Sequence, residues 1–291
     1  AIKEKKDLIT YLSYKNPKEQ SSNVIIRSNQ RINNIKYNID LEKNISDDFV
    51  YSTINKTQNI MLEENLDTEC NLSQVYRVGI TEYNDCNKYK KIFNTFNIIP
   101  ENCFSCFKIQ IEPRNVIELI KLYFVFSELD FKINLTRKCM IELRKYVSNG
   151  AYKGLIYCIG LNQANETLEI LNAILNKTIN KEVPRFIKRG CTEYAMAYPE
   201  YKEIDPTNKN FMNYKSEWKI KEEVFDKKNF NENPSSNNKE KILKGISLND
   251  ALIINNWLFY AKLIGDNSYK NICDQPIFSN YIDNMIIKKN T

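Results

Sequence analysis

Between residues 103 and 201, hydrophobic and polar positions follow each other in patterns that predict a compact succession of strands and helices. The segment FKIQIE, residues 107–112, alternates three apolar side chains with three polar ones, which is the period of a half-buried strand. Three further segments carry strand patterns: 137–144, 153–160 and part of 185–198. The segment 153–160 is a nearly continuous apolar run, which is typical of a central strand.

Two helices are predicted between these strands. Residues 115–129, NVIELIKLYFVFSEL, are apolar around most of the helix circumference, so this helix should pack on more than one side. Residues 162–179 place their leucines and isoleucines on one face, as in an amphipathic helix. The resulting order, strand-helix-strand-strand-helix-strand, is that of the ferredoxin-like or split βαβ sandwich, with both helices on one face of an antiparallel sheet. We therefore predict an α+β fold with this core and an added C-terminal helix.

The flanking regions are more polar and less regular. In the C-terminal stretch, residues 229–241 have loop composition, and residues 247–265 form a clear helical pattern with Ser247 and Asp250 at the spacing of a capping box. The N-terminal stretch carries one short helical pattern at 1–12 and strand-like runs at 23–28, 35–41 and 74–80. The sequence thus divides into a mixed N-terminal region, an α+β core, and a polar loop followed by helix, with bounds at 1–100, 101–204 and 205–291.

The amino-acid composition excludes several kinds of catalytic and metal site. The chain of 291 residues is 42% hydrophobic and 27% charged, which is ordinary for a globular protein. It contains no histidine, which excludes imidazole-dependent nucleophiles and histidine-ligated zinc or haem. No apolar stretch is long enough for a membrane span, and no signal peptide is visible, so we expect a cytoplasmic protein with reduced cysteines.

Basic residues in the core region form the first candidate site. The net charge of +6 permits an anionic partner, either a phosphate- or carboxylate-bearing small molecule or RNA. The many lysines and asparagines fit the codon bias of an AT-rich genome, so the eight arginines carry more weight, and five of them fall in this region. The guanidinium group binds anions in a bidentate manner. The candidate anion-binding residues are Arg114, Arg137, Arg144, Lys153, Arg185, Lys188 and Arg189.

Cysteines form the second candidate site. Cys103 and Cys106 are three residues apart, and Cys191 is the third candidate metal ligand in a chain of eight cysteines. Zinc or an iron–sulfur cluster is one alternative and a redox pair is another. A buried, inert role is the most common one for cysteine and is favoured here. Cys139 in particular shares the apolar face of its predicted strand and is expected in the core.

Without histidine, proton transfer would fall to carboxylates or tyrosines, and the candidates are Glu112, Glu142 and Tyr194. No glycine-rich nucleotide loop is present, because Gly150, Gly154 and Gly160 match neither the G-x-x-x-x-G-K-[ST] nor the G-x-G-x-x-G spacing.

Three functions stay open. The first, slightly favoured because the arginines cluster in one segment, is an enzyme, for example a transferase, that binds its anionic substrate through the Arg/Lys-rich face. The second is a nucleic-acid-binding or ribonucleoprotein-type module, and the third is a structural or assembly protein. The sequence does not determine the oligomeric state.

Overall fold

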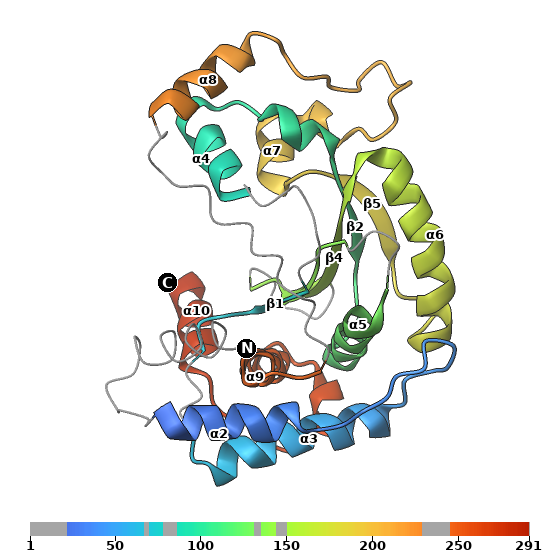
Figure 1. The fold of residues 1–291 in the computed structure, drawn as a ribbon, viewed down its shortest axis with the longest axis vertical. Coiled ribbons are helices and arrows are strands. Elements are labelled where there is room, and N and C mark those ends of the chain that lie inside the picture. The colour runs from blue at the N-terminus through green and yellow to red at the C-terminus, as the bar shows by residue number, and fades with distance from the viewer. Residues whose placement is uncertain are drawn as a thin grey trace.

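A five-stranded antiparallel sheet forms the centre of the molecule (Figure 1). The computed structural model describes residues 22–66, 70–77, 86–130, 135–143, 150–228 and 245–290. The strands lie in the order β1-β3-β4-β2-β5, and every neighbouring pair is antiparallel. Their bounds are β1 Gln74–Arg77, β2 Cys106–Ile111, β3 Arg137–Ile141, β4 Tyr152–Ile159 and β5 Arg185–Arg189.

The connections between the strands confirm the predicted fold class. Helix α5 (Val116–Glu128) lies between β2 and β3 in the chain, and α6 (Gly160–Thr178) lies between β4 and β5. Strands β3 and β4 follow one another in the chain and pair antiparallel. With the strand order β3-β4-β2-β5, this is the ferredoxin-like arrangement. Strand β1, from the N-terminal stretch, pairs with β3 and extends the sheet by one strand at that edge.

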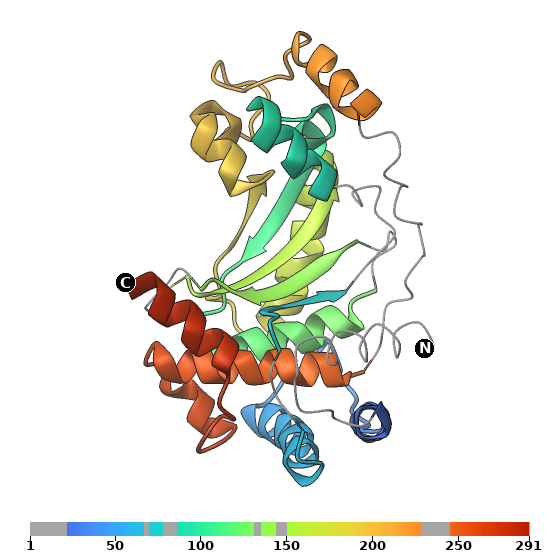
Figure 2. The ribbon, with the colours of Figure 1, turned by 90° about the vertical axis from the view of Figure 1, so that its left-hand side faces the viewer.

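Helices α5 and α6 contact the strands from the same side of the sheet (Figures 1 and 2). Helix α5 packs against β3 and β4 on one side and against α3 (Asp47–Glu63) and α9 (Leu248–Leu263) on the other. This double packing explains why nearly every side chain of α5 is buried, as its apolar circumference predicted. Helix α9 begins with the predicted capping box, in which Ser247 and Asp250 each accept a backbone N–H of the other.

The remaining helices gather at the two ends of the molecule (Figure 2). At one end, the short elements beyond the tip of β2 form a second buried cluster around Trp218 and Tyr201. They are α4 Cys86–Phe96, η1 Glu101–Ser105, α7 Thr192–Ala197, η2 Pro199–Lys202 and α8 Trp218–Lys228. At the other end lie α2 Ser22–Asn33, η3 Asn267–Asn271 and α10 Asn280–Asn290, together with α3 and α9. The main core draws side chains from all three predicted stretches of the chain.

Two predicted strands of the N-terminal stretch are wrong. Residues 23–28 belong to helix α2, whose buried positions Ile25, Ser28 and Ile32 are spaced three and four residues apart. The apolar run in this segment is short, and helix and strand cannot be told apart by periodicity over such a length. Residues 35–41 contain no strand. The predicted segments at 1–12 and 229–241 lie outside the described residues.

The last predicted strand is shorter than its pattern suggested. Strand β5 ends at Arg189, and the following residues turn into helix α7. Gly190 makes this turn with φ at +50°, a conformation that favours glycine. None of the helices in the described ranges combines the length and the apolar character needed to cross a membrane.

Candidate functional site

The two faces of the sheet have different chemistry because side chains alternate along each strand. Phe107, Ile109 and Ile111 of β2 point to the helices and belong to the main core. The other face carries lysines and aromatic rings in neighbouring positions. We call it the lysine face, defined by Tyr76, Lys108, Lys138, Lys153, Tyr157, Phe186 and Lys188.

The strand register brings the side chains of the lysine face next to one another. Lys108 on β2 lies between Tyr157 on β4 and Lys188 on β5. Lys138 on β3 pairs with Tyr76 on β1, and its ammonium nitrogen lies 5.3 Å from the centre of the tyrosine ring. The edge residues of this face are partly open to solvent, with Tyr76 48% and Phe186 43% exposed.

The lysines lie close enough to repel one another. Burial, and then the ammonium groups of Lys108 and Lys90, lower the pKa of Lys138 to about 8. Burial, followed by Lys108 and Lys153, also lowers the pKa of Lys188. Among the described residues, the ion pair on this face joins Lys153 Nζ to a carboxylate oxygen of Glu142 over 3.4 Å. The lysine face therefore carries more positive charge than its described neighbours compensate.

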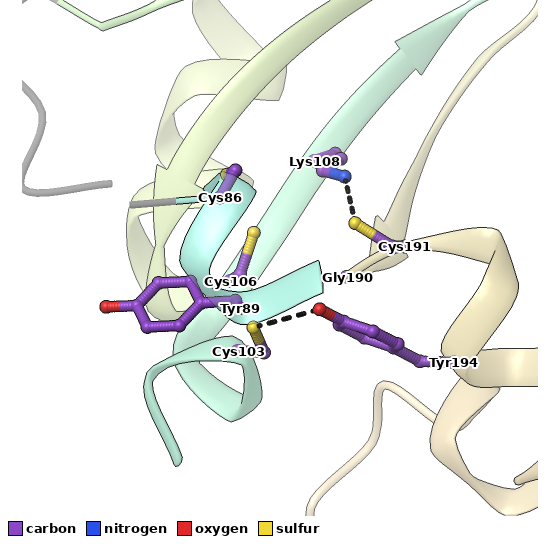
Figure 3. Close-up of a pocket in the computed structure, with 8 residues that line it drawn as sticks. All are labelled: Cys86, Tyr89, Cys103, Cys106, Lys108, Gly190, Cys191 and Tyr194. Carbon is purple, nitrogen blue, oxygen red and sulfur yellow. Dashed lines mark hydrogen bonds between the residues drawn. The ribbon is translucent and has the colours of Figure 1, made fainter. Parts of the chain in front are cut away.

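A pocket lies where the lysine face meets the second buried cluster (Figure 3). We call it the cysteine pocket, and its lining residues are Cys86, Tyr89, Cys103, Cys106, Lys108, Gly190, Cys191 and Tyr194. Lys108 Nζ donates to Cys191 Sγ over 3.3 Å, and Cys103 Sγ lies 3.7 Å from Tyr194 Oη. All three cysteines predicted as metal ligands thus face one pocket, and Cys86 is a fourth that the sequence did not indicate.

Most thiols of the cysteine pocket are protonated at neutral pH. Burial raises the pKa of Cys106 to about 12 and raises the pKa values of Cys103 and Cys86. In the part of the chain that the structure describes, no three thiol or carboxylate side chains are arranged to hold a metal ion. Zinc or an iron–sulfur cluster therefore stays a prediction. Cys139 is 2% exposed within the main core, as predicted.

Two of the predicted anion-binding arginines use their donors at the ends of helix α5. Arg114 forms ion pairs with Glu118 over 2.6 Å and Glu182 over 2.7 Å. Arg137 is fully buried and donates to the carbonyl oxygens of Phe126 and Leu129, each over 2.6 Å, where the last turn of the helix leaves them unpaired. Both arginines therefore serve the fold.

Two further arginines, Arg185 and Arg189, also donate to groups within the protein. Arg185 donates to the side-chain oxygens of Asn172 and Asn176 on α6. Arg189 is 5% exposed, donates to Met212 O over 2.8 Å and stacks on a group of aromatic rings from Phe104, Phe107, Tyr201 and Phe211. Arg144 lies outside the described residues. The structure does not gather the described arginines on one surface, whereas Lys153 and Lys188 do lie together on the lysine face.

The three candidate proton-transfer residues stand apart. Glu112 and Glu142 follow the ends of β2 and β3 beyond Ile111 and Ile141. Tyr194 lines the cysteine pocket at the opposite end of β2, near Cys103. Strand β2 has six residues, and at about 3.3 Å per residue it separates the two ends by roughly 17 Å. These residues do not form one catalytic group.

Sequence reasoning missed Lys108, Lys138, Tyr76 and Phe186 as members of the site. Their signal was present, because Lys108 and Lys138 occupy the polar positions of two correctly predicted strands. What was lacking was the register that places those positions side by side. Cys86 gave no such signal, since the distance in sequence to the other cysteines of the pocket carries no information about contact.

Comparison with known proteins finds no match among family models, curated proteins or solved structures. The functional argument therefore depends on the geometry of the lysine face and the cysteine pocket alone.

Proposed function

We propose that the protein binds single-stranded nucleic acid on the lysine face. The observation that carries the proposal is the combination, on one sheet face, of three partly exposed lysines beside the buried Lys108, with exposed aromatic rings at both edges. The three partly exposed lysines are Lys138, Lys153 and Lys188. Single-stranded nucleic acids are bound in this way, with phosphates held by basic side chains and bases stacked on aromatic rings.

The rings and lysines are spaced for such a ligand. Tyr76 lies on edge strand β1 and Phe186 on edge strand β5, so four strand spacings of about 4.8 Å separate the two rings by roughly 19 Å. Lys138 lies directly beside Tyr76, and Lys188 lies two residues from Phe186 on the same strand face. A chain of nucleotides crossing the sheet would place phosphates between its stacked bases and meet the lysines there.

The charge balance supports a polyanion. The lowered pKa values of Lys138 and Lys188 reflect the cost of holding several ammonium groups together in a partly buried setting. Phosphates placed among them would relieve this repulsion and release the counterions of the nucleic acid. The lysines are spread over four strands rather than turned towards one point, which favours a polymer with repeated charges over a single small anion.

The test is fluorescence anisotropy with labelled oligouridine and oligoadenosine, titrated at several salt concentrations. Affinity should fall as salt rises, and each phosphate contact should contribute about 0.7 to the slope of log K against log salt. The double variant Lys138→Gln/Lys188→Gln should lower this slope by about 1.4. Tyr76→Ala should weaken binding by about 1–3 kcal/mol, because it removes one stacking partner.

Lys177→Gln is the matched control. Lys177 lies on α6, on the helix side of the sheet, and forms an exposed ion pair with Glu42. Its loss changes the net charge by the same amount per residue, but should leave the slope unchanged. The proposal is wrong if the oligonucleotides fail to bind at low salt, or if the control weakens binding as much as the lysine-face variants do. Stabilisation against heat by nucleotides or phosphate, with none by oligonucleotides, would instead favour an enzyme acting on a small anion.

A further inference from the structure

The cysteine pocket gathers four of the eight cysteines of the chain from three separate segments. Cys86 begins α4, Cys103 and Cys106 flank the start of β2, and Cys191 follows β5. Cys191 and Cys86 both lie near enough to Cys103 and to Cys106 to raise the pKa of each of these two thiols. None of the four is in a disulfide. This concentration of thiols takes no part in the proposed binding of nucleic acid.

Lys108 gives one of these thiols an unusual environment. Lys108 is 6% exposed, and among the described residues its ammonium group has no carboxylate within ion-pair distance. A buried ammonium is costly unless a negative group compensates it. Burial is the largest single influence and lowers the pKa of Lys108, but Cys191, Cys106 and Tyr157 together outweigh it and raise that pKa. Lys108 therefore presents a cationic donor to Cys191 Sγ over 3.3 Å.

Gly190 directs the Cys191 side chain into this contact. Along a regular strand, Cys191 would point to the helix face, because Lys188 points to the lysine face and side chains alternate. The left-handed φ of Gly190 ends the strand and turns the chain, so that Cys191 Sγ meets Lys108 Nζ (Figure 3). The N–H of Gly190 donates to Cys106 O over 2.8 Å, which holds the turn beside the thiols of β2.

Exposure separates Cys191 from the buried thiols of the chain. Cys103, Cys106, Cys139 and Cys158 are buried, and burial raises the pKa of each. Cys191 is half-buried at the pocket and has a cationic neighbour. Cysteines that sense oxidants combine a cationic neighbour, access to solvent and a second thiol nearby. Cys191 has Lys108 Nζ at 3.3 Å, is half-buried and shares its pocket with three other thiols.

We propose that Cys191 is a peroxide-reactive cysteine, which a hydroperoxide oxidises to a sulfenic acid and which then forms a disulfide with a second thiol of the cysteine pocket. In the first step the thiolate sulfur attacks one peroxide oxygen, the O–O bond breaks, and the leaving oxygen takes a proton. In the second step Cys86, Cys103 or Cys106 attacks the sulfenic sulfur, the S–S bond forms, and water leaves. The two thiols lose two electrons in total, and the peroxide accepts them.

The experiment treats the reduced full-length chain with a small excess of hydrogen peroxide, with and without dimedone, which traps sulfenic acids. Peptide mass spectrometry then locates the adducts and the disulfides. Cys191 should react at least about tenfold faster than Cys273, a half-buried cysteine beside the neutral amide of Gln58. Without dimedone, a disulfide should link Cys191 to another cysteine of the pocket, and a thiol reductant should reverse it.

Variants of Lys108 test the cause. Lys108→Met should slow the labelling of Cys191 about tenfold, because it removes the cationic donor beside the sulfur, while Lys108→Arg should retain it. If Lys108→Met does not fold, the comparison of Cys191 with Cys273 and the Lys108→Arg variant still decide. Equal labelling of Cys191 and Cys273, or a disulfide that leaves Cys191 out, overturns the proposal. A Lys108→Met protein that folds and reacts at the original rate overturns the role of the ammonium group.

Discussion

Asp250 holds together three parts of the structure, and its replacement by alanine should cost a large fraction of the stability. Its carboxylate oxygens accept from Arg77 Nη1 over 3.3 Å, Arg77 Nη2 over 3.1 Å, Tyr123 Oη over 3.1 Å and Ser247 N over 3.1 Å. Arg77 belongs to β1, Tyr123 to α5 and Ser247 to the start of α9. Asp250 and Arg77 are each only 4% exposed, so solvent cannot replace these contacts.

The size of the loss follows from what remains after the substitution. Asp250→Ala leaves the guanidinium of Arg77 buried, with Ser127 Oγ at 3.2 Å and backbone carbonyls as its neighbours, and without a negative charge. Removing one partner of a buried ion pair destabilises a protein by about 3–5 kcal/mol. Replacing both partners by apolar residues avoids the unpaired charge. The double variant Arg77→Leu/Asp250→Leu should therefore recover most of the loss, apart from about 1 kcal/mol for the missing helix cap.

Urea unfolding followed by circular dichroism measures these differences, provided that the slope with denaturant stays the same among the variants. Glu42→Ala is the control, because it breaks the ion pair with Lys177, whose two side chains are 70% and 48% exposed. An exposed pair contributes less than about 1 kcal/mol. The reasoning is refuted if Asp250→Ala loses no more stability than Glu42→Ala, or if the double variant is as unstable as the single one.

Two further predictions concern the candidate sites. Nucleic-acid affinity should be greatest below pH 8 and should fall as the pH rises through 8. The reason is that the pKa of Lys138 is lowered to about 8, so this side chain loses its charge there, whereas a bound phosphate favours the ammonium form. In Lys138→Gln, the affinity measured across this pH range should depend less on pH. Gly190→Ala should lower the melting temperature by several degrees and slow the oxidation of Cys191. The φ angle of Gly190 is +50°, and an added Cβ atom would lie 2.0 Å from Tyr201 Oη. An unchanged melting temperature in calorimetry would contradict this prediction.

Local pattern was enough to predict the core elements of this fold. The four core strands and two helices were found from alternation and from apolar circumference, because an element half-buried against a core repeats its hydrophobic side chains with its own geometric period. The same reasoning placed Cys139 in the core and found the capping box of α9. The prediction of a strand at 23–28 was wrong, because helix α2 buries few side chains there and one of them, Ser28, is polar.

The sequence also predicted an anion-binding region from its arginines, whereas the proposed lysine face contains none of them. Arginine was preferred because lysine is abundant throughout the chain, yet Arg137 and Arg189 direct their donors to backbone carbonyls inside the protein. The guanidinium group has several donors in a plane, so it satisfies buried carbonyls as readily as it binds an external anion. Only contacts reveal which of these an arginine does.

The sequence by itself determined the class of fold and, for β2 and β3, which side chains share a face, because these depend on the spacing of side chains along a short segment. The tertiary structure alone decided which polar positions become neighbours. Lys108, Lys138 and Lys188 come together through strand register, and Cys86, Cys106 and Cys191 through the turn at Gly190 and the docking of α4. These residues are far apart in the chain, and no local period encodes their contact.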